Sequence, residues 1–192
     1  MRTLRLGTRG SQLALVQAHG VAALLQQHAG AACEIIVIKT SGDRLAEATL
    51  SQIGGKRMFV KEIEDALIAG EIDLAVHSSK DMPAVLPDGL KVGAVLPRDD
   101  PRDAIVLPPP GGASLSLEDI VRRLRHDPRV GTTSVRRVAQ CTKLFPGARF
   151  LPIRGNVDTR LRKLDSGEYD ALVLAAAGLR RLGPLPGCGR HP

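Results

Sequence analysis

Residues 72–83 read Ile-Asp-Leu-Ala-Val-His-Ser-Ser-Lys-Asp-Met-Pro. The apolar run from Ile72 to Val76 predicts a short buried strand, and the loop that follows it carries a base, Lys80, beside an acid, Asp81. In α/β proteins ligands bind at this end of the strands, where a carboxylate beside an ammonium can hold or donate a proton. Serine, aspartate and proline also favour ordinary turns, so a purely structural loop is the competing interpretation.

Strand and helix patterns alternate on both sides of this stretch. Upstream, we expect strands at 4–7 and 34–39, a helix capped by Ser11, and a helix over 59–69 that ends at Gly70. Such alternation indicates crossover units and mostly parallel sheets; no internal sequence repeat is evident, although the two halves share this rhythm. Downstream, strands are expected at 90–96, 104–107, 129–131, 149–153 and 171–175, with helices from 116 and over 134–144, 157–164 and 176–182.

Residues 97–103 are polar and twice interrupted by proline, which is typical of a hinge between domains. We therefore expect a first α/β domain at 1–98 and a second, basic one at 99–183. The remaining residues, 184–192, are predicted to form an irregular tail rich in glycine and proline.

The composition indicates a globular protein with an aliphatic core. Of the 192 residues, 43% are hydrophobic and only 2% aromatic, and no apolar run approaches the length of a membrane span. No signal-peptide pattern follows Met1. Cys33, Cys141 and Cys188 lie far apart, so neither a zinc site nor a disulfide framework is indicated, and a reducing cytoplasm is the expected location. Cys33 and Cys141 are expected to be buried, inert thiols.

The basic charge is concentrated in one segment. Residues 122–181 contain 14 Lys and Arg against 5 Asp and Glu, whereas residues 1–121 contain 12 against 15. This excess of positive charge predicts a polyanionic partner for residues 122–181, either nucleic acid or a small molecule with several carboxylates. A solvated basic surface is the alternative.

Three stretches place hydroxyls and arginines where a strand turns into a helix. They are Thr-Arg-Gly-Ser at 8–11, Gly-Thr-Thr-Ser-Val-Arg-Arg at 131–137 and Arg-Gly-Asn-Val-Asp-Thr-Arg at 154–160. Backbone N–H groups at a helix start bind anions, and the planar fork of arginine matches a carboxylate. The alternative at each stretch is an ordinary helix cap with exposed arginines.

Several enzyme classes are excluded by the motifs. There is no Gly-x-Ser-x-Gly elbow, so Ser78 is not a hydrolase nucleophile. Gly54-Gly55-Lys56 lacks the first glycine and the Ser or Thr of a phosphate-binding loop, and the five histidines have no metal-ligand spacing.

Taken together, these stretches resemble the porphobilinogen deaminase (hydroxymethylbilane synthase) family. The resemblance implies two periplasmic-binding-protein-like α/β domains with mostly parallel sheets, followed by a small third α+β domain. The matching stretches run in family order and comprise residues 6–15, 54–62, 75–83, 98–104, 131–137, 154–161 and 174–183.

The resemblance implies a cytoplasmic, typically monomeric transferase of haem biosynthesis. It would polymerise four porphobilinogen units into linear hydroxymethylbilane, with loss of ammonia, on a dipyrromethane cofactor that a thioether joins to a cysteine. Asp81 matches the catalytic aspartate, which would protonate the departing amine and stabilise the cationic intermediates, while Lys56 and Phe59 match a mobile loop. The residues that match positions binding substrate and cofactor carboxylates are Arg9, Ser11, Lys80, Thr132, Ser134, Arg136, Arg137, Arg154 and Arg160.

The match stops at Gly183, before the third domain, which carries the cofactor cysteine in a Gly-Cys-x-x-Pro context. Cys188 lies in Pro-Gly-Cys-Gly-Arg-His-Pro, whose spacing differs, so no cysteine is assigned that role. We expect a truncated product, frameshifted near Gly183, in which the first domain lacks a returning strand and exposes apolar surface. Weak stability and no unaided turnover are the expected consequences.

Two other functions remain open. A non-catalytic, two-domain clamp for polycarboxylates would use the same arginines without chemistry, and the missing cysteine favours it. Nucleic-acid binding through residues 122–181 ranks last, because the chain has no recognition motif and almost no aromatic side chains for stacking.

Overall fold

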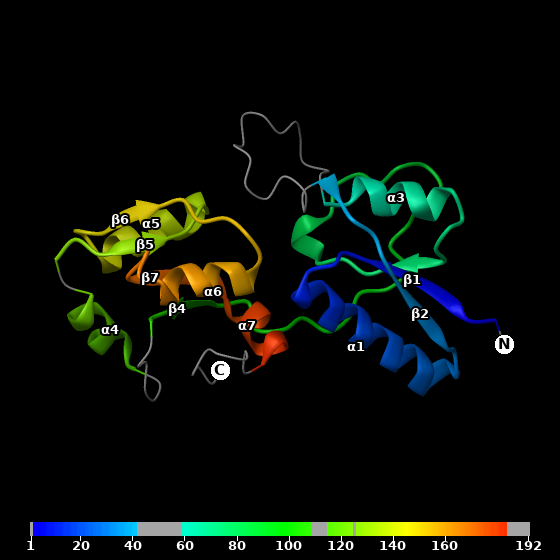
Figure 1. Ribbon diagram of the computed structural model, residues 1–192, viewed down its shortest axis with the longest axis horizontal. Helices are drawn as coiled ribbons and strands as arrows, with labels where there is room; N and C mark the ends of the chain where they lie inside the picture. The colour runs from blue at the N-terminus through cyan, green and yellow to red at the C-terminus, as the bar shows by residue number, and fades with distance from the viewer. Residues whose placement is uncertain (1, 42–58, 109–114, 125, 184–192) are drawn as a thin grey trace. The chain divides into compact units, whose positions relative to one another are not determined.

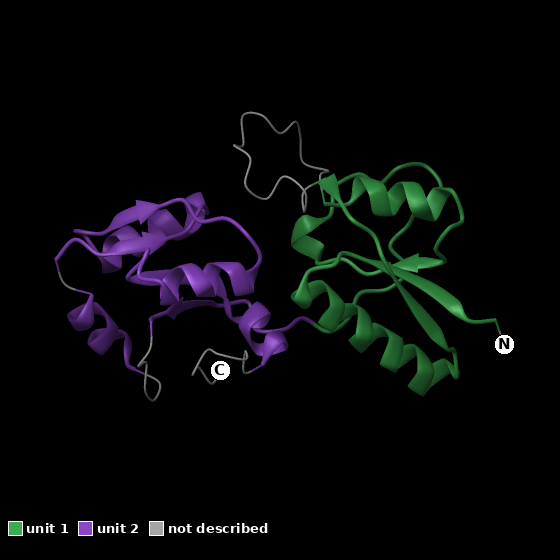
Figure 2. Cartoon of the chain, viewed as in Figure 1, with its two compact units in different colours: residues 1–97 green, residues 98–192 purple. Residues whose placement is uncertain are grey.

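A computed structural model describes residues 2–41, 59–108, 115–124 and 126–183. The chain divides into two compact units, residues 1–97 and 98–192 (Figure 2). This division lies one residue from the expected boundary after residue 98, and the expected tail at 184–192 is outside the described residues. Each unit is described by itself.

Unit 1 is a three-stranded parallel sheet with a helix on each face (Figure 1). The strand order is β2-β1-β3, so the first strand lies in the centre. Ile63 and Ala66 of one helix pack on Ile72, just before β3. The elements are β1 (Leu4–Thr8), α1 (Gln12–Ala29), β2 (Cys33–Val37), α3 (Lys61–Ile68), β3 (Leu74–Ala75) and the 3-10 turn η2 (Ser79–Asp81).

Unit 2 is a four-stranded sheet in the order β4-β7-β5-β6, in which β4 is antiparallel to β7 and the other pairs are parallel. The elements are β4 (Asp103–Val106), α4 (Leu117–Arg123), β5 (Arg129–Gly131), α5 (Val135–Leu144), β6 (Arg149–Leu151), α6 (Val157–Asp165), β7 (Ala171–Ala175) and α7 (Ala176–Leu182). The α/β class with mostly parallel sheets is thereby confirmed.

The central strand β7 is buried on both sides, which its unbroken apolar sequence predicts. Leu172 and Leu174 belong to the core cluster that includes Leu161 of α6. The alternate residues Ala171 and Val173 belong to the other cluster, formed with α4 and α5. The period of two along β7 therefore gives unit 2 two hydrophobic layers, one on each face of the sheet.

The expected caps are confirmed. The hydroxyl of Ser11 accepts the N–H of Ala14 at 3.3 Å, and Ser116 and Ser134 start α4 and α5 in the same way. Gly70 follows α3 with φ of 69°, where a residue without Cβ is favoured.

A contact made in both units ties the first parallel strand of each sheet (β1 or β5) to its third (β3 or β7). Arg5 donates to the Asp73 carboxylate from its backbone N–H at 2.8 Å and from Nε and Nη2 at 3.2 and 2.9 Å. Arg129 makes the same three bonds to Asp170 at 2.7, 3.1 and 2.8 Å. Both aspartates end a Gly-Glu-x-Asp sequence, a short local motif that the two units repeat.

The repeat extends to the glycines near the strand ends. A Cβ on Gly7 would lie 2.3 Å from Ile72, and one on Gly131 would lie 2.5 Å from Leu172 and 2.9 Å from the Tyr169 ring. In each sheet a side chain on or next to the third parallel strand lies so close to this glycine of the first that an added Cβ would force it to move.

The prediction of a strand at 90–96 is wrong. The backbone there forms no helix or strand, and Val92 and Val95 are 60% and 82% exposed. β-Branched residues stabilise a strand only when a neighbour completes the ladder. In unit 1 no such neighbour lies beyond β3 among the described residues, whereas β4 occupies the corresponding edge in unit 2. A missing returning strand stays a prediction.

We predict that Gly131→Ala destabilises unit 2 by about 1–3 kcal/mol, because the new methyl overlaps the buried side chains of Leu172 and Tyr169, which must shift within the core. Urea unfolding followed by tyrosine fluorescence measures this, since Tyr169 is the chain's one tyrosine and reports on unit 2. Gly147→Ala is the matched control, because its Cβ would meet nothing closer than 3.8 Å. Equal unfolding midpoints for both variants would contradict the close approach.

Candidate functional site

The predicted acid of unit 1 lies at the carboxyl edge of its sheet. β1 and β3 are adjacent and parallel, and the ladder continues to Val76, whose N–H donates to the Gly7 carbonyl at 3.1 Å. The loops that carry Arg9 and Asp81 therefore leave the sheet at the same edge. Asp81 ends the 3-10 turn η2 and is half-buried, and Lys80 beside it is exposed.

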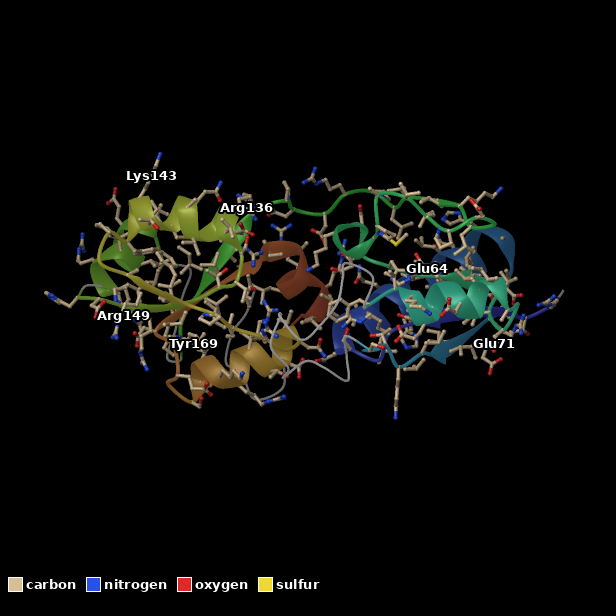
Figure 3. The ribbon with its side chains drawn as sticks, turned by 90° about the horizontal axis from the view of Figure 1, so that it is seen from above. Glu64, Glu71, Arg136, Lys143, Arg149 and Tyr169 are labelled. Carbon is tan, nitrogen blue, oxygen red and sulfur yellow. The ribbon has the colours of Figure 1, made fainter. Side chains whose placement is uncertain are left out.

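His77 lies among the charges of this edge. Burial lowers the pKa of its imidazole, the carboxylates of Asp81 and Glu64 raise it, and the guanidinium of Arg9 lowers it; the net pKa is below the ordinary 6.5. Glu64 is 3% exposed and projects from α3 (Figure 3). The imidazole is therefore neutral at neutral pH, and Asp81 faces a polar group that carries no competing charge.

Ser11 and Phe59 have defined partners near this edge. The Ser11 hydroxyl caps α1, and a hydroxyl that accepts one bond can still donate another to a ligand. The guanidinium carbon of Arg9 lies 4.2 Å from the centroid of the Phe59 ring, a contact that the sequence does not reveal. Lys56, expected on the same loop as Phe59, is outside the described residues.

The predicted anion site of unit 2 is built at the start of α5. Thr132 follows β5, is 4% exposed, and its hydroxyl accepts the Ser134 N–H at 3.2 Å. The Ser134 hydroxyl in turn accepts the Arg137 N–H at 3.5 Å. Arg136, in the first turn of α5, is labelled in Figure 3. The end of β5, the buried Thr132 and the capping Ser134 thus fix the start of α5. Arg136 and Arg137 project from this first turn.

Arg136 and Arg137 hold the carboxylate of Asp103, the first residue of β4. Arg137 donates to Oδ1 from Nη2 at 2.8 Å and Nε at 3.1 Å, and its Nη1 donates to the Val173 carbonyl at 2.9 Å. Arg136 Nη2 lies 2.7 Å from Oδ2. Burial alone would raise the pKa of Asp103, but the bonds from both arginines outweigh it, and the pKa lies below the ordinary 3.8. Sequence reasoning missed Asp103.

Arg160 adds charge that Asp103 does not balance. Its Nε donates to the Gly155 carbonyl at 2.8 Å, and no ion pair within 4 Å joins it to a carboxylate in the described part of the chain. Burial, and next the charge of Arg137, lower the pKa of its guanidinium. Arg154 is half-buried on the same turn, after β6. Three guanidinium groups near one carboxylate leave a positive excess that an anionic ligand can neutralise.

Other arginines of the basic segment have acidic partners of their own. Arg129 pairs with Asp170, Arg149 with Asp127 at 2.9 Å, and Arg180 with Asp100 at 2.7 Å. Part of the basic excess is therefore structural, as the solvated-surface alternative holds. The predicted anion-binding residues of this segment are those that follow β5 and β6.

The cysteines of the described residues lie away from both sheet edges that carry these charges. Cys33 is the first residue of β2 and so lies at the opposite edge from Asp81. Cys141 is 6% exposed in the core of unit 2, where burial raises the pKa of its thiol. Neither thiol is placed to react with a ligand at the carboxyl edges.

The described residues contain neither a metal-binding cluster nor a membrane-spanning helix. No group of three or more His, Cys, Asp or Glu side chains is arranged to hold a metal ion between residues 2 and 183, leaving out the gaps at 42–58, 109–114 and 125. Within the same ranges, every helix is too short or too polar to cross a bilayer.

A hollow of about 340 Å³ in unit 2 lies at the other end of the sheet from the arginines. Leu107, Leu124, His126 and Pro128 line it, and Pro128 directly precedes β5. None of the predicted site residues lines this hollow. The candidate site is therefore described by the residues at the strand ends and not by this hollow.

Comparison with known proteins gives a family match along almost the whole chain. The family model described as "Porphobilinogen deaminase, dipyromethane cofactor binding domain" matches residues 4–186. The porphobilinogen deaminase of Syntrophobacter fumaroxidans is 49% identical over 183 residues, 95% of this chain and 57% of its own. That of Acidithiobacillus ferrooxidans is 52% identical over 182 residues, 94% of this chain and 57% of its own. The chain thus spans little more than half the length of these relatives.

Solved structures match less closely. An ancestral cationic amino acid solute binding protein is 15% identical, with 89% of this chain and 68% of its own covered and a TM-score of 0.42. An ancestral arginine-binding protein bound to arginine is 22% identical, with 90% and 70% covered and the same TM-score. The architecture of the two units therefore rests on the strand orders described above.

We predict that Asp103→Asn lowers the stability of unit 2 by about 1–3 kcal/mol at pH 7, because two guanidinium groups lose a charged acceptor. A carboxylate with a depressed pKa stabilises the fold above its unfolded pKa, near 4, and the contribution is lost as the pH falls through the folded pKa. The difference between wild type and variant should therefore shrink below about pH 4. Urea unfolding at several pH values measures it; a difference that stays constant down to pH 3 would contradict the ion pairs.

Proposed function

Because the chain belongs to the porphobilinogen deaminase family, we propose that it binds porphobilinogen and supplies the catalytic carboxylate for its deaminating polymerisation to hydroxymethylbilane, a reaction of tetrapyrrole biosynthesis. The observation that carries the proposal is the positive excess of Arg136, Arg137 and Arg160 around the single carboxylate of Asp103. Each porphobilinogen unit brings two carboxylates, which such a group of arginines neutralises.

Asp81 is the proposed proton donor. Its carboxylic acid gives a proton to the amine, which becomes an ammonium paired with the resulting carboxylate, and ammonia leaves as the bond between the methylene carbon and nitrogen breaks. The methylene carbon then bonds to the free α-carbon of the preceding pyrrole, which loses its proton. The carboxylate left on Asp81 stabilises the positive charge that develops on the ring during these steps. His77 beside it is neutral and therefore adds no positive charge that would offset this negative charge.

The matched family model is the part of the family that binds the dipyrromethane cofactor, and the arginines of unit 2 fit the carboxylates of such a group. When bound, this group supplies the primer to which new units are joined. Arg136, Arg137, Arg154 and Arg160 would hold its carboxylates. Cys33 starts β2 and Cys141 is buried in the core of unit 2, so neither of these two thiols is assigned the thioether.

We predict that Asp81→Asn weakens porphobilinogen binding roughly three- to tenfold, because the aminomethyl group is cationic and loses a charged partner. The deaminated analogue, with a methyl in place of the aminomethyl group, should bind both proteins equally. Calorimetric titration of both ligands measures this. Ammonia release, where present, should fall by about a hundredfold or more in the variant. Release that survives the substitution would contradict the catalytic role.

We predict that Arg160→Gln weakens binding of porphobilinogen by about tenfold or more, since it removes a half-buried cation that lacks a carboxylate partner. Arg149→Gln is the matched control in the same basic segment, because Arg149 is exposed and paired with Asp127. Equal loss of affinity in both variants would indicate general electrostatic attraction instead of a defined site. Retained binding without any ammonia release would select the non-catalytic clamp.

A further inference from the structure

A stacking contact in unit 1 joins a strand end to the start of a helix. Arg9 directly follows β1, and Phe59 lies two residues before α3. The guanidinium carbon of Arg9 is 4.2 Å from the centroid of the Phe59 ring. The two residues are distant in sequence, so the fold of unit 1 brings them together.

The geometry of this contact suits a guanidinium that also binds a carboxylate. The electron-rich face of an aromatic ring attracts the flat face of the cation. A carboxylate binds in the plane of the guanidinium, along its N–H edges. Stacking and carboxylate binding therefore use different parts of the same group, and the ring restricts a long side chain that otherwise samples many rotamers.

Arg9 is held close to the proposed catalytic group. The positive charge of Arg9 lowers the pKa of His77, and the negative charge of Asp81 raises it. The three side chains therefore form one electrostatic group at the carboxyl edge of the sheet. A ligand carboxylate on Arg9 would thus bind within the field of Asp81.

The start of α3 has a buried anchor in the residue after Phe59. Val60, the next residue, is fully buried and its carbonyl accepts the N–H groups of Ile63 and Glu64 at 3.1 and 2.8 Å. Phe59 itself is half-buried. Its ring is therefore available for a role other than anchoring α3.

We propose that Phe59 is a positioning residue, whose ring holds the guanidinium of Arg9 in the orientation that binds a substrate carboxylate beside Asp81. This inference rests on the proposed function and adds a determinant of substrate affinity to it. It assigns Phe59 a partner within unit 1, in addition to the loop position that the family resemblance implies.

The test is calorimetric titration of the full chain with porphobilinogen at fixed salt. Phe59→Leu keeps apolar bulk but removes the ring face, and should weaken binding roughly three- to tenfold, whereas Phe59→Tyr should stay within about twofold of wild type. Phe150→Leu, the same change at a half-buried phenylalanine of unit 2, is the matched control and should leave affinity unchanged. Should Phe59→Leu unfold, 3,4,5-trifluorophenylalanine at position 59 keeps the shape and weakens the ring face.

A double-mutant cycle separates positioning from packing. In an Arg9→Gln background, Phe59→Leu should have no further effect, because the ring then has no cation to orient. Full additivity of the two changes, or wild-type affinity in Phe59→Leu, would overturn the inference while the proposed function stands, provided that Arg9→Gln weakens binding. Absence of porphobilinogen binding by the wild-type chain would overturn both.

Discussion

The bond pattern from Arg5 to Asp73, made again from Arg129 to Asp170, is the constraint on which both units depend. Each pair fixes the start of the third parallel strand against the first, and the glycine further along the first parallel strand leaves room for the side chain that directly precedes the aspartate. The strands then run parallel in register and end together. The candidate site residues lie at those ends, on the loops and on the helix starts that follow the strands, with Asp103 at the start of β4.

The same framework explains how several arginine side chains can lie close together in unit 2. Arg137 is anchored by Asp103 and by the Val173 carbonyl, so its position does not depend on a ligand. Arg160 is anchored by a neutral carbonyl and keeps its full charge within a half-buried site. Such preorganised cations exchange little solvent when an anion arrives, which favours binding of a carboxylate over the same contacts in water.

Local signals made much of the fold predictable, and long-range contacts account for what was missed. The serine caps of α1, α4 and α5 could be predicted from the sequence, because each cap involves residues within one helical turn. The strand expected at 90–96 failed because β-branched residues do not reveal whether a neighbouring strand exists. Asp103 escaped notice because it reaches Arg137 only through the antiparallel pairing of β4 with β7. The Arg9 contact with Phe59 likewise depends on tertiary structure alone.

The central claim is that ligand carboxylates bind at the carboxyl edges of both sheets. Titration of isotope-labelled protein with porphobilinogen, followed by amide chemical shifts, tests it most directly. The account predicts shifts concentrated in residues 8–11, 77–82 and 131–136. Shifts at the opposite edges, around Cys33 and Pro128, or none at saturating ligand, would contradict it.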